Sequence, residues 1–207
     1  MPVADPIVFI VDDDESVREA ISNLLESIGL TAKTFGSTEE FLRTDRPDIP
    51  SCLVLDVMLP GMRGLEFQEV LERSGISIPI IFITAHGDIP MTSRAMKAGA
   101  IDFLAKPFPK EDLLSAIHKG LALDSSKREE RNYLNSLQMR FEQLTPREQE
   151  VMDLVASGII NKEIAVKLDI SEVTVKIHRR QVMEKMEAQS LADLVRMSDK
   201  LKFRARR

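Results

Sequence analysis

The sequence has little of what secreted and membrane proteins carry. Its 207 residues include a single cysteine, Cys52, so no disulfide can form within the chain. No apolar run approaches the roughly 20 residues that a membrane-spanning helix needs, and the N-terminus lacks the basic segment of a signal peptide. We therefore expect a cytoplasmic protein without membrane insertion, in which Cys52 is a buried structural thiol.

Charge is distributed unevenly along the chain. Residues 1–120 carry 11 Lys and Arg against 19 Asp and Glu, whereas residues 143–207 carry 13 against 10. An acidic first part and a basic last part suggest two functions, the second on nucleic acid. A mildly basic solvated surface would give the same excess, so charge alone does not decide.

Residues 1–121 alternate between strand and helix patterns. Short apolar runs, typical of strands buried on both faces, alternate with segments of helical spacing. The expected strands are Ile7–Val11, Thr31–Phe35, Cys52–Leu55, Ile78–Ile83 and Ile101–Ala105. Five strands separated by helices predict an α/β fold, a doubly wound five-stranded parallel sheet of the flavodoxin type.

Polar side chains follow the predicted strands: Asp12, Asp13, Asp56, Thr84 and Lys106. Because the active crevice of such sheets lies beyond the carboxyl ends of the strands, we expect these residues to converge. Each alone has an ordinary structural explanation, such as a turn aspartate or a surface lysine. Their joint occurrence at four strand ends favours a site.

Three carboxylates in one place require a cation, and oxygen ligands suit Mg²⁺ or Mn²⁺. Asp13 and Asp56 are the expected direct ligands, Asp12 binds directly or through water, and the backbone carbonyl of Met58 could be a third ligand. A carboxylate can also attack phosphorus. The metal, Lys106 and Thr84 would then stabilise the phosphoryl oxygens.

Residues 5–120 resemble a response-regulator receiver domain. The matching motifs are Val11-Asp12-Asp13-Asp14, Leu55-Asp56-Val57-Met58-Leu59-Pro60-Gly61-Met62-Arg63-Gly64, Thr84-Ala85-His86-Gly87-Asp88 and Lys106-Pro107-Phe108. The resemblance implies that Asp56 accepts a phosphoryl group from a sensor histidine kinase, that the Lys106–Pro107 peptide is cis, and that Phe103 is a switch residue. Phosphorylation would pull Thr84 toward Asp56, Phe103 would turn inward, and the chain would form a homodimer. Met58 departs from the family, which commonly has a polar side chain there.

Residues 122–141 form a charged segment without glycine or proline. Such a composition suits a flexible linker, but it also has good helix propensity. We favour a helical linker.

Residues 142–207 have helical spacing throughout, which predicts an all-α domain of four helices. Thr145-Pro146-Arg147-Glu148 is a capping-box signature. The segments Asn161–Leu168 and Ser171–Met186, joined by a short turn, predict a helix-turn-helix. The second helix has an apolar stripe on one side and Lys176, Arg179 and Arg180 on the other, which fits a DNA major groove.

This segment resembles the LuxR/NarL-type DNA-binding domain, through Leu144-Thr145-Pro146-Arg147-Glu148, Gly158, Asn161-Lys162-Glu163-Ile164-Ala165, Leu168, Ile170-Ser171, Thr174-Val175-Lys176 and His178. The whole chain is most similar to the FixJ-like branch. The resemblance implies three sets of residues. Base contacts are expected from Lys176, Ile177 and Arg180, phosphate contacts from Lys162, Thr174, Arg179 and Lys185, and dimerisation on DNA through Leu191, Leu194 and Val195. Ile160 and Glu187 depart from the family pattern, which puts the local loop geometry in question.

The sequence therefore predicts a regulator in a two-component system. Phosphorylation at Asp56 would promote dimerisation and binding to double-stranded promoter DNA, with RNA polymerase as a further partner and activation as the expected effect. One alternative is a phosphorylation-independent DNA binder with a degenerate receiver. Another is a phosphatase with an aspartate nucleophile, but Met58 cannot serve as the general acid that this class needs two residues after the nucleophile.

Overall fold

The computed structural model describes residues 5–85 and 89–205, with side chains up to Phe203. The described chain divides into two compact units, residues up to Arg128 and residues from Glu129 onward. None of the described helices is long and apolar enough to cross a membrane.

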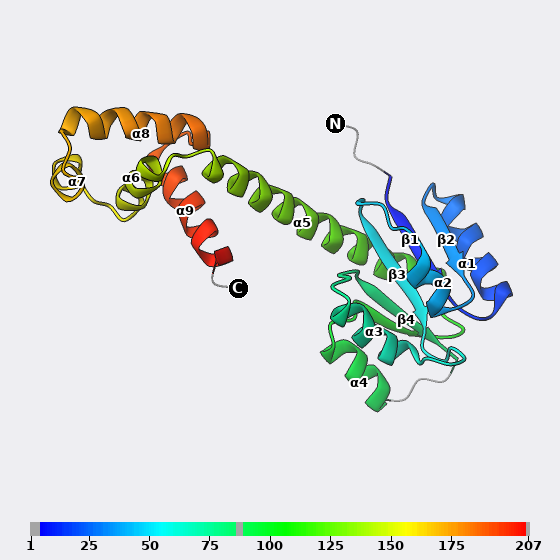
Figure 1. The fold of residues 1–207 in the computed structure, drawn as a ribbon. Helices are drawn as coiled ribbons and strands as arrows, with labels where there is room; N and C mark the ends of the chain where they lie inside the picture. Colours follow the sequence, from blue (N-terminus) through cyan, green and yellow to red (C-terminus); the bar gives the residue numbers. More distant parts are fainter. Residues whose placement is uncertain (1–4, 86–88, 206–207) are drawn as a thin grey trace. The chain divides into compact units, whose positions relative to one another are not determined.

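The first unit contains a five-stranded parallel sheet in the order β2-β1-β3-β4-β5 (Figure 1). Its strands are Ile7–Val11 (β1), Thr31–Phe35 (β2), Ser51–Asp56 (β3), Ile80–Thr84 (β4) and Asp102–Ala105 (β5). Its helices are Glu15–Ser27 (α1), Thr38–Arg43 (α2), Gly64–Arg73 (α3), Ile89–Lys97 (α4) and the start of Lys110–Glu142 (α5). The predicted doubly wound α/β fold is confirmed.

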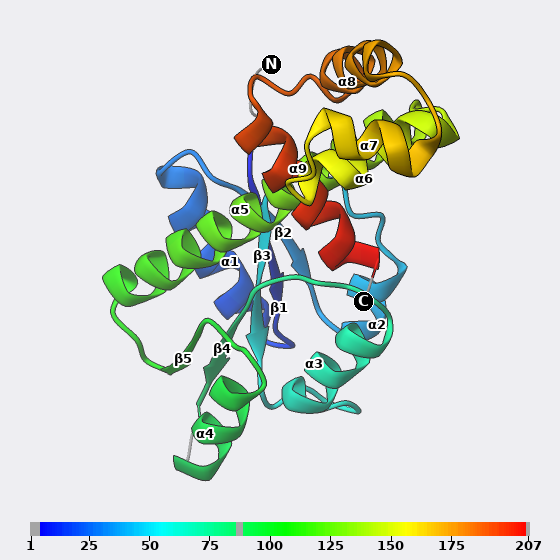
Figure 2. The ribbon, with the colours of Figure 1, turned by 90° about the vertical axis from the view of Figure 1, so that its left-hand side faces the viewer.

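Helices cover both faces of the sheet (Figure 2). Alternating side chains of the central strands supply two apolar cores, one on each face. On one face Phe9, Leu53 and Phe82 pack with residues of α2, α3 and α4. On the other face Ile10 and Val54 pack with residues of α1 and α5. β1, β3 and β4 are buried on both sides, which is why they appear in the sequence as continuous apolar runs.

Local capping explains where the helices of the first unit begin. The Asp14 side chain accepts the backbone N–H of Ser16 at 2.9 Å and so caps α1. The Ser37 side chain accepts the N–H of Glu40 and caps α2. Asp88, the residue that could cap α4, lies outside the described residues.

α5 runs without a break from Lys110 to Glu142, so the charged segment 122–141 is entirely helical. Its first part belongs to the first unit. There, Asp124 is buried and accepts the Ser51 N–H at 2.9 Å and Arg128 Nε at 2.5 Å, while Arg128 also pairs with Asp48. These contacts fix α5 against the beginning of β3.

The second unit is a helical domain around its own core. Its helices are the last part of α5, Pro146–Ala156 (α6), Asn161–Leu168 (α7), Glu172–Met186 (α8) and Leu191–Ala205 (α9). Leu137 of α5 and Leu144 are buried in this core with residues of all four following helices. The predicted all-α helix-turn-helix domain is confirmed.

The two sequence departures lie at helix ends. Ile160 occupies the N-cap position of α7, where it makes no side-chain cap. Glu187 follows α8 with φ of 54°, a left-handed conformation in which a Cβ is unfavourable and glycine is common. Arg140 of α5 pairs with the Glu187 carboxylate at 2.6 Å and donates to the Met186 carbonyl at 3.4 Å.

A candidate phosphoacceptor site and DNA-reading helix

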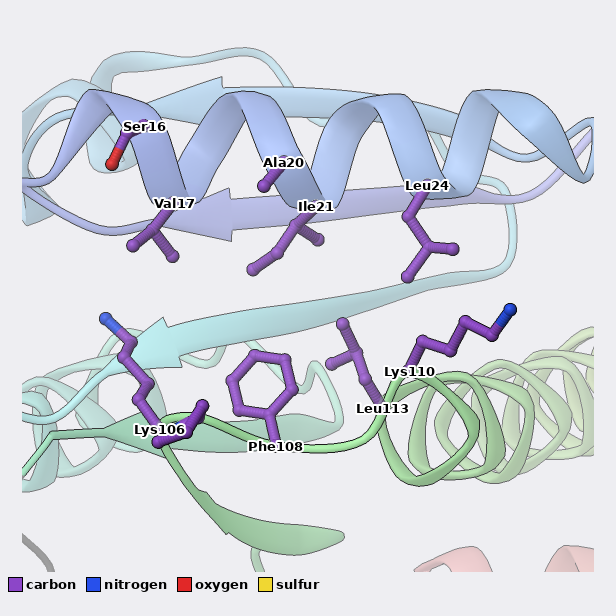
Figure 3. A pocket seen from close by; sticks show the side chains of 10 residues that line it. Ser16, Val17, Ala20, Ile21, Leu24, Lys106, Phe108, Lys110 and Leu113 are labelled. Carbon is purple, nitrogen blue, oxygen red and sulfur yellow. The ribbon is translucent and has the colours of Figure 1, made fainter.

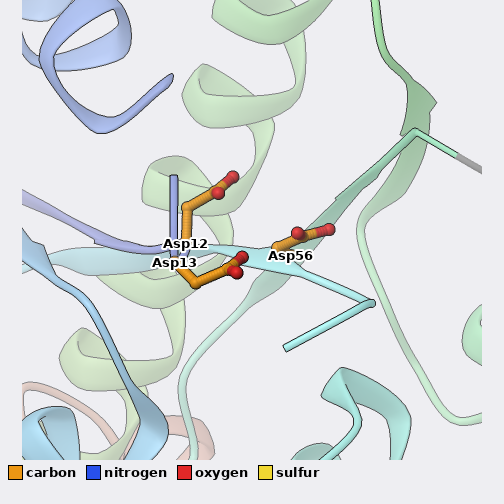
Figure 4. A group of neighbouring side chains, drawn as sticks. All are labelled: Asp12, Asp13 and Asp56. Atoms are coloured by element: carbon orange, nitrogen blue, oxygen red, sulfur yellow. The ribbon is translucent and has the colours of Figure 1, made fainter. Parts of the chain in front are cut away.

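Three carboxylates meet at the carboxyl edge of the sheet. Asp12 and Asp13 follow β1, and Asp56 ends the neighbouring β3 (Figure 4). One oxygen from each of the three lies within 4.8 Å of the others. Asp12 and Asp56 are buried, at 0% and 6% exposed, whereas Asp13 is exposed to solvent. The site is therefore open on the Asp13 side.

Lys106 is the cation in contact with this cluster. Its Nζ lies 2.6 Å from Asp12 Oδ2 and 3.6 Å from Asp56 Oδ2. Its backbone N–H donates to the Thr84 carbonyl at 2.7 Å, which fixes it at the end of β5. The Lys106–Pro107 peptide is cis, as the resemblance predicted.

Burial raises the pKa of the Asp56 carboxyl above its ordinary value. The Lys106 charge opposes this rise, Asp12 adds to it, the Met58 N–H opposes it and Asp13 adds to it. The Met58 N–H donates to Asp56 Oδ1 at 3.3 Å. Burial and the two neighbouring carboxylates disfavour the ionised form of Asp56. A bound cation would stabilise that form.

The donor set fits a hard divalent cation. Of the three carboxylates, two pair with the same lysine, so the cluster keeps an excess of negative charge, and all its donor atoms are oxygens. The structure therefore contains a clustered acidic site compatible with a divalent metal ion.

Backbone packing keeps the loop after Asp56 in place. Gly64 begins α3 with its N–H donated to the Val57 carbonyl at 2.9 Å. A Cβ on Gly64 would lie 2.6 Å from the Asp56 carbonyl oxygen, a distance that side chains do not tolerate. Only glycine allows α3 to start this close to the loop after Asp56.

The predicted switch residues lie on adjacent strands. Thr84 ends β4, is 0% exposed and pairs in register with Ala105 of β5. Phe103 is half-buried on β5, and its ring packs against Phe82 with centroids 6.2 Å apart. Both residues are thus on the strands that lead from the acid cluster to the edge of the sheet.

An apolar groove begins beside the acid cluster (Figure 3). It lies between α1 and the segment that joins β5 to α5, and its volume is about 560 Å³. Val17, Ile21 and Leu24 line one side, and Phe108 and Leu113 line the other. Lys106 belongs both to this groove and to the acid cluster.

In the second unit, α8 presents a mixed cationic and apolar face. Val175, Val182 and Met186 are buried in the core, whereas Lys176 and Arg180 are exposed and Ile177 is 52% exposed. The Ser171 side chain caps the helix by accepting the Thr174 N–H at 3.1 Å.

Several residues predicted to contact DNA also contact other side chains of the domain. Arg179 donates to Asn161 of α7 at 2.5 Å, and Arg180 pairs with Glu184 at 2.7 Å. Lys185 lies 2.6 Å from the buried Glu148 carboxylate. Lys162 is exposed at the start of α7. Lys185 thus holds α8 against α6 in addition to any contact with phosphate.

The three residues predicted to form the dimer contact, Leu191, Leu194 and Val195, differ in exposure. Leu194 is 1% exposed within the domain's own core, so it is not available to a partner in this conformation. Leu191 is 46% exposed and Val195 is half-buried. A dimer contact through α9 would therefore use these two residues.

Sequence reasoning missed one residue at the acid cluster. Arg18 of α1 donates from Nη1 to the backbone carbonyls of Asp12 at 2.7 Å and Asp13 at 3.0 Å. Its position five residues after Asp13, on a helix that begins in that loop, was the available signal. Nothing in its residue type distinguished it from the other arginines of the chain.

Comparison with known proteins agrees with this geometry. Residues 8–118 match the family described as response regulator receiver domain, and residues 142–198 match the bacterial regulatory proteins of the luxR family. The chain belongs to the two-component response regulators that join a receiver to a LuxR-type DNA-binding domain and regulate transcription. Within this class it falls in the FixJ-like branch.

Individual relatives cover nearly the whole chain. Nodulation protein W of Bradyrhizobium diazoefficiens is 54% identical over 94% of this chain and 86% of its own length. The transcriptional regulatory protein FixJ of Rhizobium meliloti is 41% identical over 95% of this chain and 96% of its own. The solved structure of the response regulator StyR is 52% identical, with a TM-score of 0.86 over 95% of this chain and 100% of that one.

Proposed function

We propose that Asp56 is the phosphoacceptor and that its phosphorylation by a partner sensor histidine kinase promotes dimerisation and binding to promoter DNA. The observation that carries the proposal is the meeting of Asp12, Asp13, Asp56 and Lys106 at one sheet edge in a chain that also has a LuxR-type domain. The protein would act in the cytoplasm, where promoter DNA and RNA polymerase are found, with activation as the expected effect.

In the transfer step, an Asp56 carboxylate oxygen attacks the phosphorus of a phosphohistidine. A P–O bond forms, the P–N bond breaks, and the imidazole leaves with the electron pair. Asp12, Asp13, Asp56 and the Met58 carbonyl would hold Mg²⁺, which neutralises phosphoryl oxygen charge when bound. Lys106, 3.6 Å from Asp56, would move its ammonium group from the carboxylates to a phosphoryl oxygen.

Thr84 and Phe103 would transmit the effect of phosphorylation from Asp56 to the surface of the receiver. The Thr84 hydroxyl would donate to a phosphoryl oxygen, and Phe103, half-buried against Phe82, would turn into the space left behind. This movement would alter the surface formed by α4, β5 and α5 and favour a receiver dimer. Pairing two DNA-binding domains would then raise avidity for two half-sites.

On DNA, α8 would enter the major groove. Lys176, Ile177 and Arg180 would contact bases, and Lys162, Thr174, Arg179 and Lys185 would contact phosphates. Arg180 pairs with Glu184 in the free protein, so its base contact requires this exposed pair to rearrange. Leu191 and Val195 would contribute the apolar contact between the two bound domains.

The apolar groove next to Lys106, which Ala20 also lines, would receive the kinase. Lys106 lines the groove and pairs with Asp56, so a partner seated in the groove would bring its phosphohistidine close to Asp56. Ala20→Arg would fill the groove and is expected to slow transfer from the kinase by at least about tenfold while leaving transfer from acetyl phosphate unchanged. Ala20→Ser is the size-matched control. Equal loss with both donors would contradict docking in the groove.

Radiolabel transfer tests the central proposal. Wild type should be labelled by a small phosphodonor in Mg²⁺, and Asp56→Asn should not, whereas the exposed control Asp45→Asn should behave as wild type. DNA binding across genomic fragments should increase with phosphodonor for wild type only. If Asp56→Asn bound the same fragments with the same affinity as phosphorylated wild type, the chain would be a phosphorylation-independent DNA binder.

Turnover would support the second alternative, a phosphatase. Met58, two residues after Asp56, has no side-chain proton to give a leaving alcohol, which argues for a phosphoryl acceptor with at most slow self-dephosphorylation. Multiple turnovers on small phosphate esters would contradict this.

A further inference from the structure

The two aspartates after β1 are held in different ways. The Asp12 carboxylate accepts the Asp14 N–H at 3.0 Å on one oxygen and Lys106 Nζ at 2.6 Å on the other. The Asp12 N–H also donates to the Phe35 carbonyl at 3.2 Å. Asp12 is therefore fixed through both its backbone and its side chain.

Asp13 has no such support for its side chain. Its carboxylate is exposed and accepts no hydrogen bond from the described part of the chain, yet it lies within the 4.8 Å cluster with Asp12 and Asp56. Since no described group holds the Asp13 carboxylate by a hydrogen bond, its position depends on the backbone of Asp13. The orientation of the Asp13 peptide thus decides where its carboxylate points.

Arg18 fixes that peptide. One nitrogen, Nη1, donates to the Asp12 carbonyl at 2.7 Å and to the Asp13 carbonyl at 3.0 Å, so one side chain bridges consecutive peptide groups. Arg18 is half-buried, and its own N–H donates to the Asp14 carbonyl at 3.1 Å. The guanidinium group is planar and always charged, and its fixed geometry suits two convergent acceptors.

We propose that Arg18 is a positioning residue that sets the divalent-cation affinity of the acid cluster by orienting the Asp12 and Asp13 peptides. This inference rests on the proposed metal site. Arg18 does not touch the metal or the phosphoryl group. It acts as outer-shell groups do in metal sites, where replacing a partner of a ligand weakens metal binding by about 10–100-fold.

Charge and orientation predict opposite results at this position. Arg18 is a cation near a cation site, so its charge alone opposes metal binding, and removing it would strengthen binding. Loss of orientation would weaken binding. The direction of the change therefore separates the two effects.

The experiment measures Mg²⁺ affinity of the full chain by calorimetry, for wild type, Arg18→Gln and Arg18→Lys. Arg18→Gln should bind Mg²⁺ about tenfold more weakly. Arg18→Lys keeps the charge but loses the planar guanidinium group whose Nη1 bridges the two carbonyls, and its affinity should lie between those of wild type and Arg18→Gln. Arg73→Gln makes the same charge change at a largely exposed position on α3 and should match wild type.

A second readout excludes a general loss of structure. With acetyl phosphate as donor, the half-saturating Mg²⁺ concentration for Asp56 labelling should rise in Arg18→Gln by the same factor, while the rate at saturating Mg²⁺ returns to the wild-type value. If Arg18→Gln folds poorly, Arg18→Lys carries the same comparison. Unchanged or tighter Mg²⁺ binding by both variants would overturn the inference.

The outcomes also separate this inference from the proposed function. If wild type bound no Mg²⁺, the metal site itself would be wrong and the inference with it. If wild type bound Mg²⁺ and Asp56→Asn bound it more weakly, but the Arg18 variants bound it as wild type does, then only the role of Arg18 would be wrong.

Discussion

Each unit of the protein contains a buried carboxylate next to a lysine, but the two arrangements differ in charge balance. In the DNA-binding unit, Glu148 is 3% exposed, accepts Lys185 Nζ at 2.6 Å and accepts the Thr145 N–H at 2.7 Å. One lysine neutralises one carboxylate. In the receiver, Lys106 pairs with Asp12 and Asp56, two members of a cluster of three carboxylates.

This difference separates a structural site from a functional one. The Glu148 pair completes a capping box and holds α8 to α6, so its charges are satisfied within the fold. The receiver cluster has unneutralised negative charge, and burial together with Asp12 and Asp13 raises the pKa of Asp56. A site that is incomplete without a ligand is expected where function requires one to bind.

Asp124 gives the largest expected effect among the satisfied carboxylates. Asp124→Ala would leave the buried Ser51 N–H without its acceptor and would remove one of the two carboxylates that pair with Arg128, which should destabilise the receiver by about 3 kcal/mol. The loss of stability is measured by urea unfolding of the full chain, with hydrogen exchange of the β3 amides as the probe of the receiver. Glu69→Ala, which breaks the exposed pair with Arg73, should cost less than about 0.5 kcal/mol. Equal losses would show that the Asp124 contacts are unimportant.

The Lys185 prediction concerns the second unit. Lys185→Met would leave Glu148 buried and unneutralised, with an expected loss of about 2 kcal/mol. Tyr133 is the only tyrosine and there is no tryptophan, so tyrosine fluorescence reports on this unit, where Tyr133 packs 4.5 Å from Lys200 Nζ. Lys202→Met removes an exposed pair with Asp153 and serves as control. A loss no larger than the control's would contradict the structural role.

How much of this could be foreseen from the sequence depends on whether a feature is local. Strands buried on both faces leave continuous apolar runs, so the sheet and its strand-end residues were predictable. The Asp124–Ser51 contact was not, because it spans 73 residues of sequence and depends on the tertiary fold. The Arg18 contacts are local, at five and six residues, but the residue type of Arg18 gave no sign of them. Leu194 was ambiguous because core and interface positions share the same helical spacing.

The boundary between the two units also depends on tertiary contacts that the sequence does not reveal. The composition of residues 122–141 correctly favoured a helix, since helix propensity is local. The division after Arg128 follows from contacts of Asp124 and Arg128 with residues of the receiver, and no composition change marks it. We therefore propose that the receiver includes residues up to Arg128 rather than ending at Leu121.

Asp56→Asn should stabilise its unit, whereas Asp124→Ala and Lys185→Met should destabilise theirs. In metal-free buffer it removes a charge that burial, Asp12 and Asp13 disfavour, so the receiver should become more stable at neutral pH. Added Mg²⁺ should raise the melting temperature of wild type more than that of the variant. Asp45→Asn, at an exposed position, should change neither quantity. A destabilised Asp56→Asn would indicate that its carboxylate is satisfied within the fold.

The smallest expected effect is the contribution of Glu148 to the pH dependence of stability in the second unit. Burial raises the pKa of Glu148, but the Lys185 hydrogen bond and the Thr145 N–H outweigh it, so the pKa in the folded state lies below its ordinary value. Such a group contributes its full stability above the unfolded pKa, and the contribution disappears as the pH falls through the folded pKa. Wild type should thus lose more stability than Glu148→Gln on acidification below about pH 5, measured by tyrosine fluorescence in urea. Other carboxylates titrate in the same range in both proteins, so the difference between the two curves isolates Glu148. Parallel curves would mean that the Lys185 pair does not hold the ionised form, and the contrast with the receiver cluster would disappear.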